Sequence, residues 1–227
     1  MNILNNLMSL LQDALYLLPI SLLSLTVHEF AHGFTAYKLG DPTAKDQGRL
    51  TFNPIKHIDP IGFIMMVIFR VGYAKPVPVN PLYFKKPKLG MLITAAAGPL
   101  SNLVIAVFCS FFSALFAVLS MQAPTIAALD VLFTVFFLTT VINLSLFVFN
   151  LIPVHPFDGS RILGYFLPNS YHSFVHKYGT YIYIAFFVFL IATDYVETAI
   201  STVQMFLYNC LMFVWLVPVS ALVNLFI

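Results

Sequence analysis

Stretches of apolar residues separated by short polar segments make up most of the chain. Five of them are apolar almost throughout, at about residues 14–38, 89–120, 131–153, 174–193 and 199–226. A helix of about 20 apolar residues crosses the roughly 30 Å hydrocarbon core of a bilayer, and each stretch approaches that length. The pattern therefore predicts an all-α polytopic membrane protein with about five transmembrane helices, folded as a single integral-membrane domain over residues 1–227.

The segment between the first two stretches has a different pattern. Residues 49–54 end in a proline and predict a short strand, while residues 61–69 are apolar but too short to span a bilayer. That second run fits a strand pair, a re-entrant segment or an interfacial helix. Three prolines within residues 74–81 favour extended backbone. We therefore expect a short membrane-associated strand or extended region at residues 48–81.

Composition and charge agree with a membrane protein and give it an orientation. Hydrophobic residues make up 60% of the chain and charged residues 9%, against about 25% charged in ordinary soluble domains. All basic residues lie within residues 38–88 or 161–177, and the positive-inside rule places both blocks in the cytoplasm. We expect the N-terminus outside, a lipid bilayer around the chain and no nucleic acid among its partners. Cys109 and Cys210 lie in apolar runs and are interpreted as buried small side chains.

The first apolar stretch contains the sequence His28-Glu29-Phe30-Ala31-His32. Residues four apart lie on one face of a helix, so both imidazoles can reach one point and bind a zinc ion there. Glu29 can then take a proton from a zinc-bound water. A chance match to this pattern should occur in roughly one chain in a hundred of this length. Polar residues that only hold helices together are the other alternative, and the metal site is favoured because ionisable groups within a span usually mark a working site.

Zinc held by two histidines needs a third ligand and an open position for water. The third apolar stretch ends where Pro153 and Pro156 break the helix, and Asp158-Gly159 then forms a turn. The Asp158 carboxylate is thus expected at the cytoplasmic end of one span, near the depth of the two histidines in another. Asp158 is the predicted third ligand, although without the histidine motif it would be interpreted as an aspartate that ends a helix.

Asn102 is a polar residue at membrane depth in the second apolar stretch. The default interpretation of such an asparagine is a contact between helices, and the sharper one is a hydrogen-bond donor of a catalytic site. The other histidines fall in cytoplasmic loops and are interpreted as surface or interfacial residues: His57, His155, His172 and His176. Among these His155 is the strongest alternative ligand, because it lies three residues from Asp158.

Taken in order, these motifs resemble those of the site-2 protease family, the intramembrane zinc metalloproteases. His28-Glu29-x-x-His32 lies in the first span, Gly98 stands four residues before Asn102 in the second, and Asn150-x-x-Pro153 precedes Asp158-Gly159 in the third. The segments at residues 48–60 and 74–81 are similar to the short prokaryotic branch of that family. No inserted PDZ domain and no nucleotide-sensing domain is apparent. Phe157 departs from the family pattern, where leucine is common.

The resemblance covers about residues 20–168 and implies a three-helix catalytic core. The core spans would be those at about 14–38, 89–120 and 131–153, and the spans at about 174–193 and 199–226 would be accessory. The implied activity is that of a zinc-dependent intramembrane endopeptidase, which hydrolyses peptide bonds within or near transmembrane segments of membrane protein or peptide substrates. The implied location is the prokaryotic cell membrane, with the active site towards the cytoplasmic side.

The residues and the resemblance agree on one mechanism. One Zn²⁺ per chain would be held by His28, His32 and Asp158, and Glu29 would accept a proton and return it to the leaving amine. Asn102, with Asn150, would orient the substrate or stabilise the developing oxyanion. A transmembrane substrate must unwind before attack, and residues 48–81 would receive the unwound strand. The alternative for the extended residues 74–81 is a plain cytoplasmic loop.

The runner-up function is a membrane zinc-binding protein without hydrolysis, either a transporter or an inactive relative that acts as a chaperone. A transporter usually places several ligands along a path, whereas the predicted ligands form a single site. A site that only binds metal also has no need of a carboxylate at Glu29.

Overall fold

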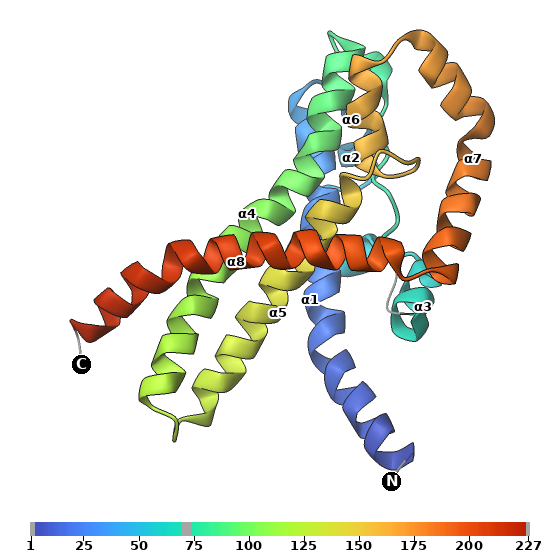
Figure 1. Cartoon of the computed structure of the whole chain (residues 1–227). Coiled ribbons are helices and arrows are strands. Elements are labelled where there is room, and N and C mark those ends of the chain that lie inside the picture. Colours follow the sequence, from blue (N-terminus) through green and yellow to red (C-terminus); the bar gives the residue numbers. More distant parts are fainter. Residues whose placement is uncertain (1–2, 70–73, 226–227) are drawn as a thin grey trace.

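The computed structural model describes residues 3–69 and 74–225, and these are helical over most of their length (Figure 1). The α-helices are α1 (Ile3–Lys38), α2 (Thr43–Asp46), α3 (Pro60–Phe69), α4 (Pro87–Gln122), α5 (Ala127–Asn150), α6 (Asp158–Phe166), α7 (Asn169–Ala192) and α8 (Tyr195–Asn224). Two short 3₁₀ helices are η1 (Pro54–Lys56) and η2 (Pro81–Tyr83). The prediction of an all-helical fold is confirmed.

Among the described residues, four helices are long and apolar enough to cross a membrane. They are the Ala14–Lys38 part of α1 and the helices α4, α5 and α8. The predicted span at about 174–193 falls in α7, which is not among these helices; within the described residues its apolar part is Lys177–Leu190. The five predicted spans are therefore not all confirmed.

The helices that carry the predicted site pack against one another. α4 and α5 form an antiparallel hairpin, α1 lies along α4 and α5, and α6 packs on the start of α4 (Figure 1). Small residues such as Ala95, Gly98 and Ala106 are buried on α4, which lets the neighbouring helices approach its backbone closely.

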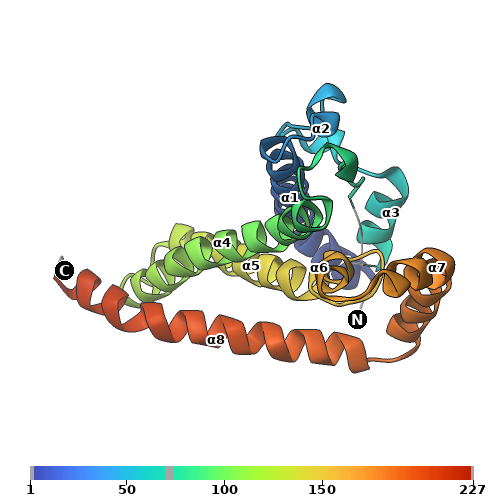
Figure 2. The ribbon, with the colours of Figure 1, turned by 90° about the horizontal axis from the view of Figure 1, so that it is seen from above.

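α8 crosses α4 and α5 obliquely and contacts both (Figures 1 and 2). Tyr208 of α8 packs with Ala106 and Leu144 in one apolar cluster. Two polar contacts reinforce this packing: the Ser145 hydroxyl donates to Gln204 Oε1 at 2.7 Å, and the Trp215 indole donates to Ser110 Oγ at 3.0 Å. α7 stands apart from α1, α4 and α5 in both views.

The predicted strand at residues 49–54 is wrong, because the backbone there bends instead. Thr51 Oγ1 accepts from the Asn53 amide, and Asn53 Oδ1 accepts from the Ile55 amide, so side chains satisfy the donors that a ladder would use. Among the described residues the only pairing of this type is an isolated bridge between Ile58 and Ala74. Of the three alternatives for residues 61–69, the structure has a helix, α3. Residues 74–80 are extended, as predicted.

Candidate metal centre

α1 places the two motif histidines on one face, one turn apart. Their Nε2 atoms lie 3.0 Å from each other, and both side chains are buried. The helix reaches past this point because its residues are apolar and free of interior glycines until Gly33. It ends at Lys38, and Gly40 with φ of 110° turns the chain away. The spacing therefore produces the predicted convergence of two imidazoles.

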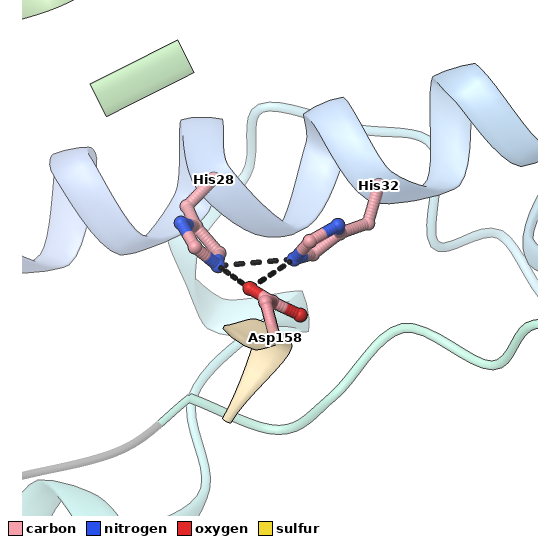
Figure 3. Close-up of side chains that lie close together, drawn as sticks. All are labelled: His28, His32 and Asp158. Carbon is pink, nitrogen blue, oxygen red and sulfur yellow. Dashed lines mark hydrogen bonds and ion pairs between the residues drawn. The ribbon is translucent and has the colours of Figure 1, made fainter. Parts of the chain in front are cut away.

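Asp158, the first residue of α6, contacts both histidines. Asp158 Oδ2 lies 3.1 Å from His32 Nε2 and 3.2 Å from His28 Nε2 (Figure 3). The next residue, Gly159, packs directly on the end of α5, where a Cβ would come within 2.3 Å of the Leu151 carbonyl oxygen. Burial alone would raise the pKa of the Asp158 carboxyl, but its contacts with His28 and His32 outweigh burial and lower that pKa. The carboxylate is therefore ionised at neutral pH.

Backbone and side-chain acceptors fix which nitrogen of each ring faces the centre. His32 Nδ1 lies 2.7 Å from the carbonyl oxygen of Thr94, and a carbonyl can only accept. His32 Nδ1 therefore carries a hydrogen, and Nε2 is the atom that faces Asp158. His28 Nδ1 lies 2.6 Å from Asn102 Oδ1, so its orientation depends on which way the Asn102 amide points.

A chain of three polar residues settles the orientation of that amide. Asn143 Nδ2 donates to the Thr139 carbonyl oxygen at 2.8 Å, which leaves Asn143 Oδ1 to accept from Asn102 Nδ2, also at 2.8 Å. Asn102 therefore presents its oxygen to His28, and His28 Nδ1 is the donor. Ser24 Oγ accepts a second hydrogen from Asn143 at 2.9 Å. This series of hydrogen bonds ends on the Thr139 carbonyl, which can only accept, and it therefore fixes His28. Since the Thr94 carbonyl fixes His32, both histidines direct Nε2 to the same point.

α4 touches the two imidazoles directly at Gly98. A Cβ built on Gly98 would lie 2.4 Å from His32 Nε2 and 2.6 Å from His28 Nε2. Only a glycine allows the α4 backbone to lie this close to the two nitrogen atoms. The small residue of the second predicted motif thus forms one wall of the site.

The three side chains fit a zinc ion. Two imidazole nitrogens and a carboxylate oxygen form a donor set typical of catalytic zinc. The three ligand atoms lie within 4.8 Å of one another and all three residues are buried. Within residues 3–69 and 74–225, this is the one group of three or more His, Cys, Asp or Glu side chains close enough to share a metal ion. Three electron-rich atoms at such distances repel one another unless a proton or a cation lies between them.

Glu29 lies beside this centre and contacts a different part of the chain. Its Oε2 accepts a hydrogen bond from the Val77 backbone amide at 2.8 Å. Val77 belongs to the extended residues 74–80, which we call the strap. The predicted base therefore belongs to the histidine helix, and its carboxylate is held by the strap.

The structure gives the other predicted residues different surroundings. Asn150 Nδ2 donates to Leu146 of its own helix at 2.9 Å and makes no described contact with the cluster. Asn102 holds His28 instead of facing an open position. His155 lies outside the cluster, and burial together with nearby Arg161 lowers its pKa. Of the surface and interfacial positions predicted for His57, the surface one is wrong, because its ring is buried and bonds to the Thr51 carbonyl. Cys109 is buried as predicted, whereas the same prediction for Cys210 is wrong, because Cys210 is exposed on α8. The side chains of His172 and His176 lie outside the described residues.

Sequence reasoning missed Ser24, Thr94 and Asn143. Asn143 had a detectable signal, because it is a polar residue within an apolar span and stands two helical turns before Asn150 on the same face. Thr94 contributes a backbone carbonyl, and no property of its side chain indicates that role.

Comparisons with known proteins agree with this geometry. The sequence profile described as "Peptidase family M50" matches residues 113–193. A Bacillus subtilis (strain 168) protein named "Putative zinc metalloprotease YwhC" is 41% identical over 178 residues, which cover 78% of this chain and 80% of the relative.

Two mycobacterial relatives carry the name "Putative zinc metalloprotease Rip2". The one from Mycolicibacterium smegmatis is 36% identical over 92 residues, 38% of this chain and 35% of the relative. The one from Mycobacterium tuberculosis H37Rv is 31% identical over 150 residues, 63% of this chain and 53% of the relative. No solved structure matches significantly. With 80% of the first relative covered at 41% identity, the chain belongs to peptidase family M50, the site-2 protease family of metallopeptidases.

Proposed function

We propose that this chain is a zinc-dependent intramembrane endopeptidase with one zinc ion per chain, acting on membrane protein or peptide substrates. The observation that carries the proposal is the convergence of His28, His32 and Asp158 next to Glu29, on helices long enough to span a bilayer. The names of the relatives, which state zinc and metalloprotease, support the same chemistry.

Each residue of the site has a role in the proposed reaction. His28, His32 and Asp158 would hold the zinc, which supplies Lewis acidity: it lowers the pKa of water to about 7 and polarises a carbonyl. Glu29 accepts a proton during attack and returns it to the leaving amine.

We assign different roles to the two asparagines, positioning to Asn102 and charge stabilisation to Asn150. The contacts of Asn102 support a role in holding His28, because its amide hydrogens are directed to Asn143 Oδ1 and, at 3.5 Å, to the Ser24 carbonyl. Asn150 uses one amide hydrogen within α5, and the second is the candidate donor to a developing oxyanion.

The proposed orientation puts the site towards the cytoplasmic side of a prokaryotic cell membrane, with the N-terminus outside. His32 lies six residues before Lys38, the basic end of the first span. Lys45 in α2 and Lys88 in the first turn of α4 lie at the same end of the molecule.

A helical substrate must unwind before its peptide bonds can be attacked. We propose that extended backbone in residues 48–81 receives the unwound strand, because the strap already lies beside Glu29. The double variant Pro76→Ala/Pro78→Ala tests this step. Unchanged cleavage of every substrate in a panel of transmembrane peptides would remove this step from the proposal.

The decisive experiment compares wild type with Glu29→Gln, purified in detergent without chelator. Zinc content and cleavage of the peptide panel are measured for both, and Glu197→Gln on α8 serves as the matched control. We expect about one zinc in all three proteins, consistent with a single ligand set, and cleavage in wild type and Glu197→Gln only. Zinc in wild type without cleavage of any peptide would favour a non-hydrolytic zinc protein, and cleavage by Glu29→Gln would remove the proposed base.

A further inference from the structure

The strap is fixed to the rest of the protein on both sides of Val77. On one side, the Lys75 amide donates to the His57 carbonyl at 2.7 Å, and Arg49 Nη2 donates to the Lys75 carbonyl at 2.6 Å. On the other side, the Asn80 amide donates to Asp41 Oδ2 at 2.7 Å. Arg49 and Asp41 are both buried. The strap is therefore a short backbone bridge with two anchored ends.

The middle of the strap packs on α1 where that helix has no side chain. Gly33 lies one turn after Glu29 on the same face. A Cβ at position 33 would come within 3.0 Å of Val77 Cγ1, and the Val77 side chain is buried. The same residue of the strap thus places its side chain on Gly33 and its amide on Glu29.

The sequence of the strap restricts which amide can reach Glu29. Pro76 and Pro78 flank Val77 and have no N–H, so Val77 supplies the one donor of that tripeptide. The bond uses Oε2, and within the described part of the chain Oε1 accepts no hydrogen bond. One carboxylate oxygen is held by a fixed backbone donor, and the other remains available.

We propose that the Val77 amide positions the Glu29 carboxylate for proton transfer, with Oε2 held by the strap and Oε1 exchanging the proton. Val77 is then a positioning residue that acts through Glu29. A glutamate side chain has three rotatable bonds, and a preorganised donor removes the need to orient it during the reaction. This inference rests on the proposed role of Glu29 as the base.

The first test exploits the repeated Val in Pro76-Val77-Pro78-Val79. Val77→Pro removes the amide hydrogen in backbone that is already extended, where proline is tolerated. Val79→Pro is the matched control, because the Val79 amide donates no hydrogen bond within the described residues. Val77→Thr keeps the amide and the branched shape of the side chain.

We expect kcat to fall in the variant that lacks the Val77 amide hydrogen and to recover in the variant that keeps it. Val77→Pro should lower kcat about 10- to 100-fold more than Val79→Pro, the range for one hydrogen bond to a charged group. Val77→Thr should restore most of that loss, and zinc content should be equal in all variants. KM is measured with the transmembrane peptide that wild type cleaves fastest, and both proline variants are expected to have similar KM values.

The second test needs neither substrate nor turnover. Hydrogen exchange of valine amides is followed in ¹⁵N-valine-labelled protein, with Val77→Pro and Val79→Pro identifying the two strap signals by their disappearance. Glu29→Ala should speed exchange at Val77 by about 10-fold or more and leave Val79 unaltered, because only Val77 loses an acceptor. Glu29→Gln should retain protection, since its side-chain oxygen still accepts.

The outcomes separate the inference from the proposed function. Equal kcat in the two proline variants, or equal Val77 exchange in wild type and Glu29→Ala, would overturn the positioning role while leaving Glu29 as base. A rise in kcat in Val77→Pro would also overturn it, because it would identify the strap as a block over Glu29. Full activity of Glu29→Gln would instead remove the proposed function itself.

Discussion

At the scale of single residues, two glycines that lack a side chain are as important for the site as the polar residues in it. Gly98 lets the α4 backbone lie against both Nε2 atoms, and Gly33 lets the strap lie against α1. The motif residues His28, Glu29, His32 and Asp158 were predicted from spacing and turn chemistry, and the structure brings the three predicted ligands together. Ser24, Thr94 and Asn143 were not predicted, because their roles depend on which faces of α1, α4 and α5 meet.

Gly98→Ala should strongly reduce zinc binding. The added Cβ would lie within 2.6 Å of both Nε2 atoms and force the rings or α4 apart. A displacement of about 1 Å can cost roughly 100-fold in rate, so we expect at least that loss of cleavage, with zinc content well below that of wild type. Zinc content by elemental analysis checks this, with Ala97→Ser as a control that adds one atom to the neighbouring position. Full zinc occupancy in Gly98→Ala would contradict the described wall of the site.

Asn143→Leu should weaken zinc retention although Asn143 touches no ligand. The change leaves Asn102 free to rotate, so its nitrogen can face His28. Changes to such outer partners typically cost about 10- to 100-fold in metal affinity. Zinc loss against a competing chelator measures the effect.

Asn150→Leu is the matched control, because its amide bonds only within α5 and its zinc retention should equal that of wild type. A large fall in cleavage by Asn150→Leu at full zinc occupancy would support its proposed oxyanion role. Equal zinc retention in Asn143→Leu and Asn150→Leu would show that the polar chain does not orient His28.

At the scale of elements, aromatic packing between segments surrounds the turn that carries Asp158, the predicted third ligand. The Phe157 ring lies 4.5 Å from that of Phe149 at the end of α5 and 5.7 Å from that of Phe186 on α7, measured between ring centroids. Phe157 directly precedes Asp158. α7, none of whose described side chains belongs to the metal-site cluster, thereby supports the turn that carries Asp158.

Phe157→Ala should weaken zinc binding, while Phe157→Leu should retain it. Truncation to alanine removes both aromatic contacts and leaves a space beside Asp158, whereas leucine fills most of that volume. Zinc retention against a chelator is compared for the two variants, with Phe189→Ala on an exposed part of α7 as the control. Similar retention in Phe157→Ala and wild type would show that the turn is held by other contacts.

The elements themselves were partly predictable. Long apolar runs indicate helices because no other local structure satisfies the backbone in lipid, and α1, α4, α5 and α8 follow the prediction. Residues 49–54 do not form the predicted strand, because the Thr51 and Asn53 side chains accept hydrogen bonds from the Asn53 and Ile55 amides and give the backbone a local alternative. The predicted span at about 174–193 falls in α7, which within the described residues is not among the helices long and apolar enough to cross a membrane, so that span stays a prediction.

At the scale of the whole molecule, charge and site lie at one end. The N-terminus and the turn between α4 and α5 lie at the bottom of Figure 1, and α2, α6 and the start of α4 lie at the top. Lys38 ends α1, Lys45 lies in α2 and Lys88 lies in the first turn of α4, so these basic residues belong to the top end. The predicted orientation therefore assigns the upper end to the cytoplasm.

Cysteine labelling in intact cells tests this orientation. In a chain with Cys109 and Cys210 changed to serine, Ala123→Cys marks the α4–α5 turn and Lys85→Cys marks the basic end. A membrane-impermeant maleimide should label position 123 in intact cells and position 85 only after the membrane is opened. The opposite pattern would invert the proposed topology.

The separation of Asp158 from His32 by 126 positions has a consequence for synthesis of the protein. The ribosome releases both histidines and Glu29 long before the residue that completes the donor set. Until α5 and the turn after it have been made, the nascent chain contains only two of the three predicted ligands. Under the proposed mechanism, a newly made molecule therefore gains hydrolytic capacity only after Asp158 has been added and has joined His28 and His32.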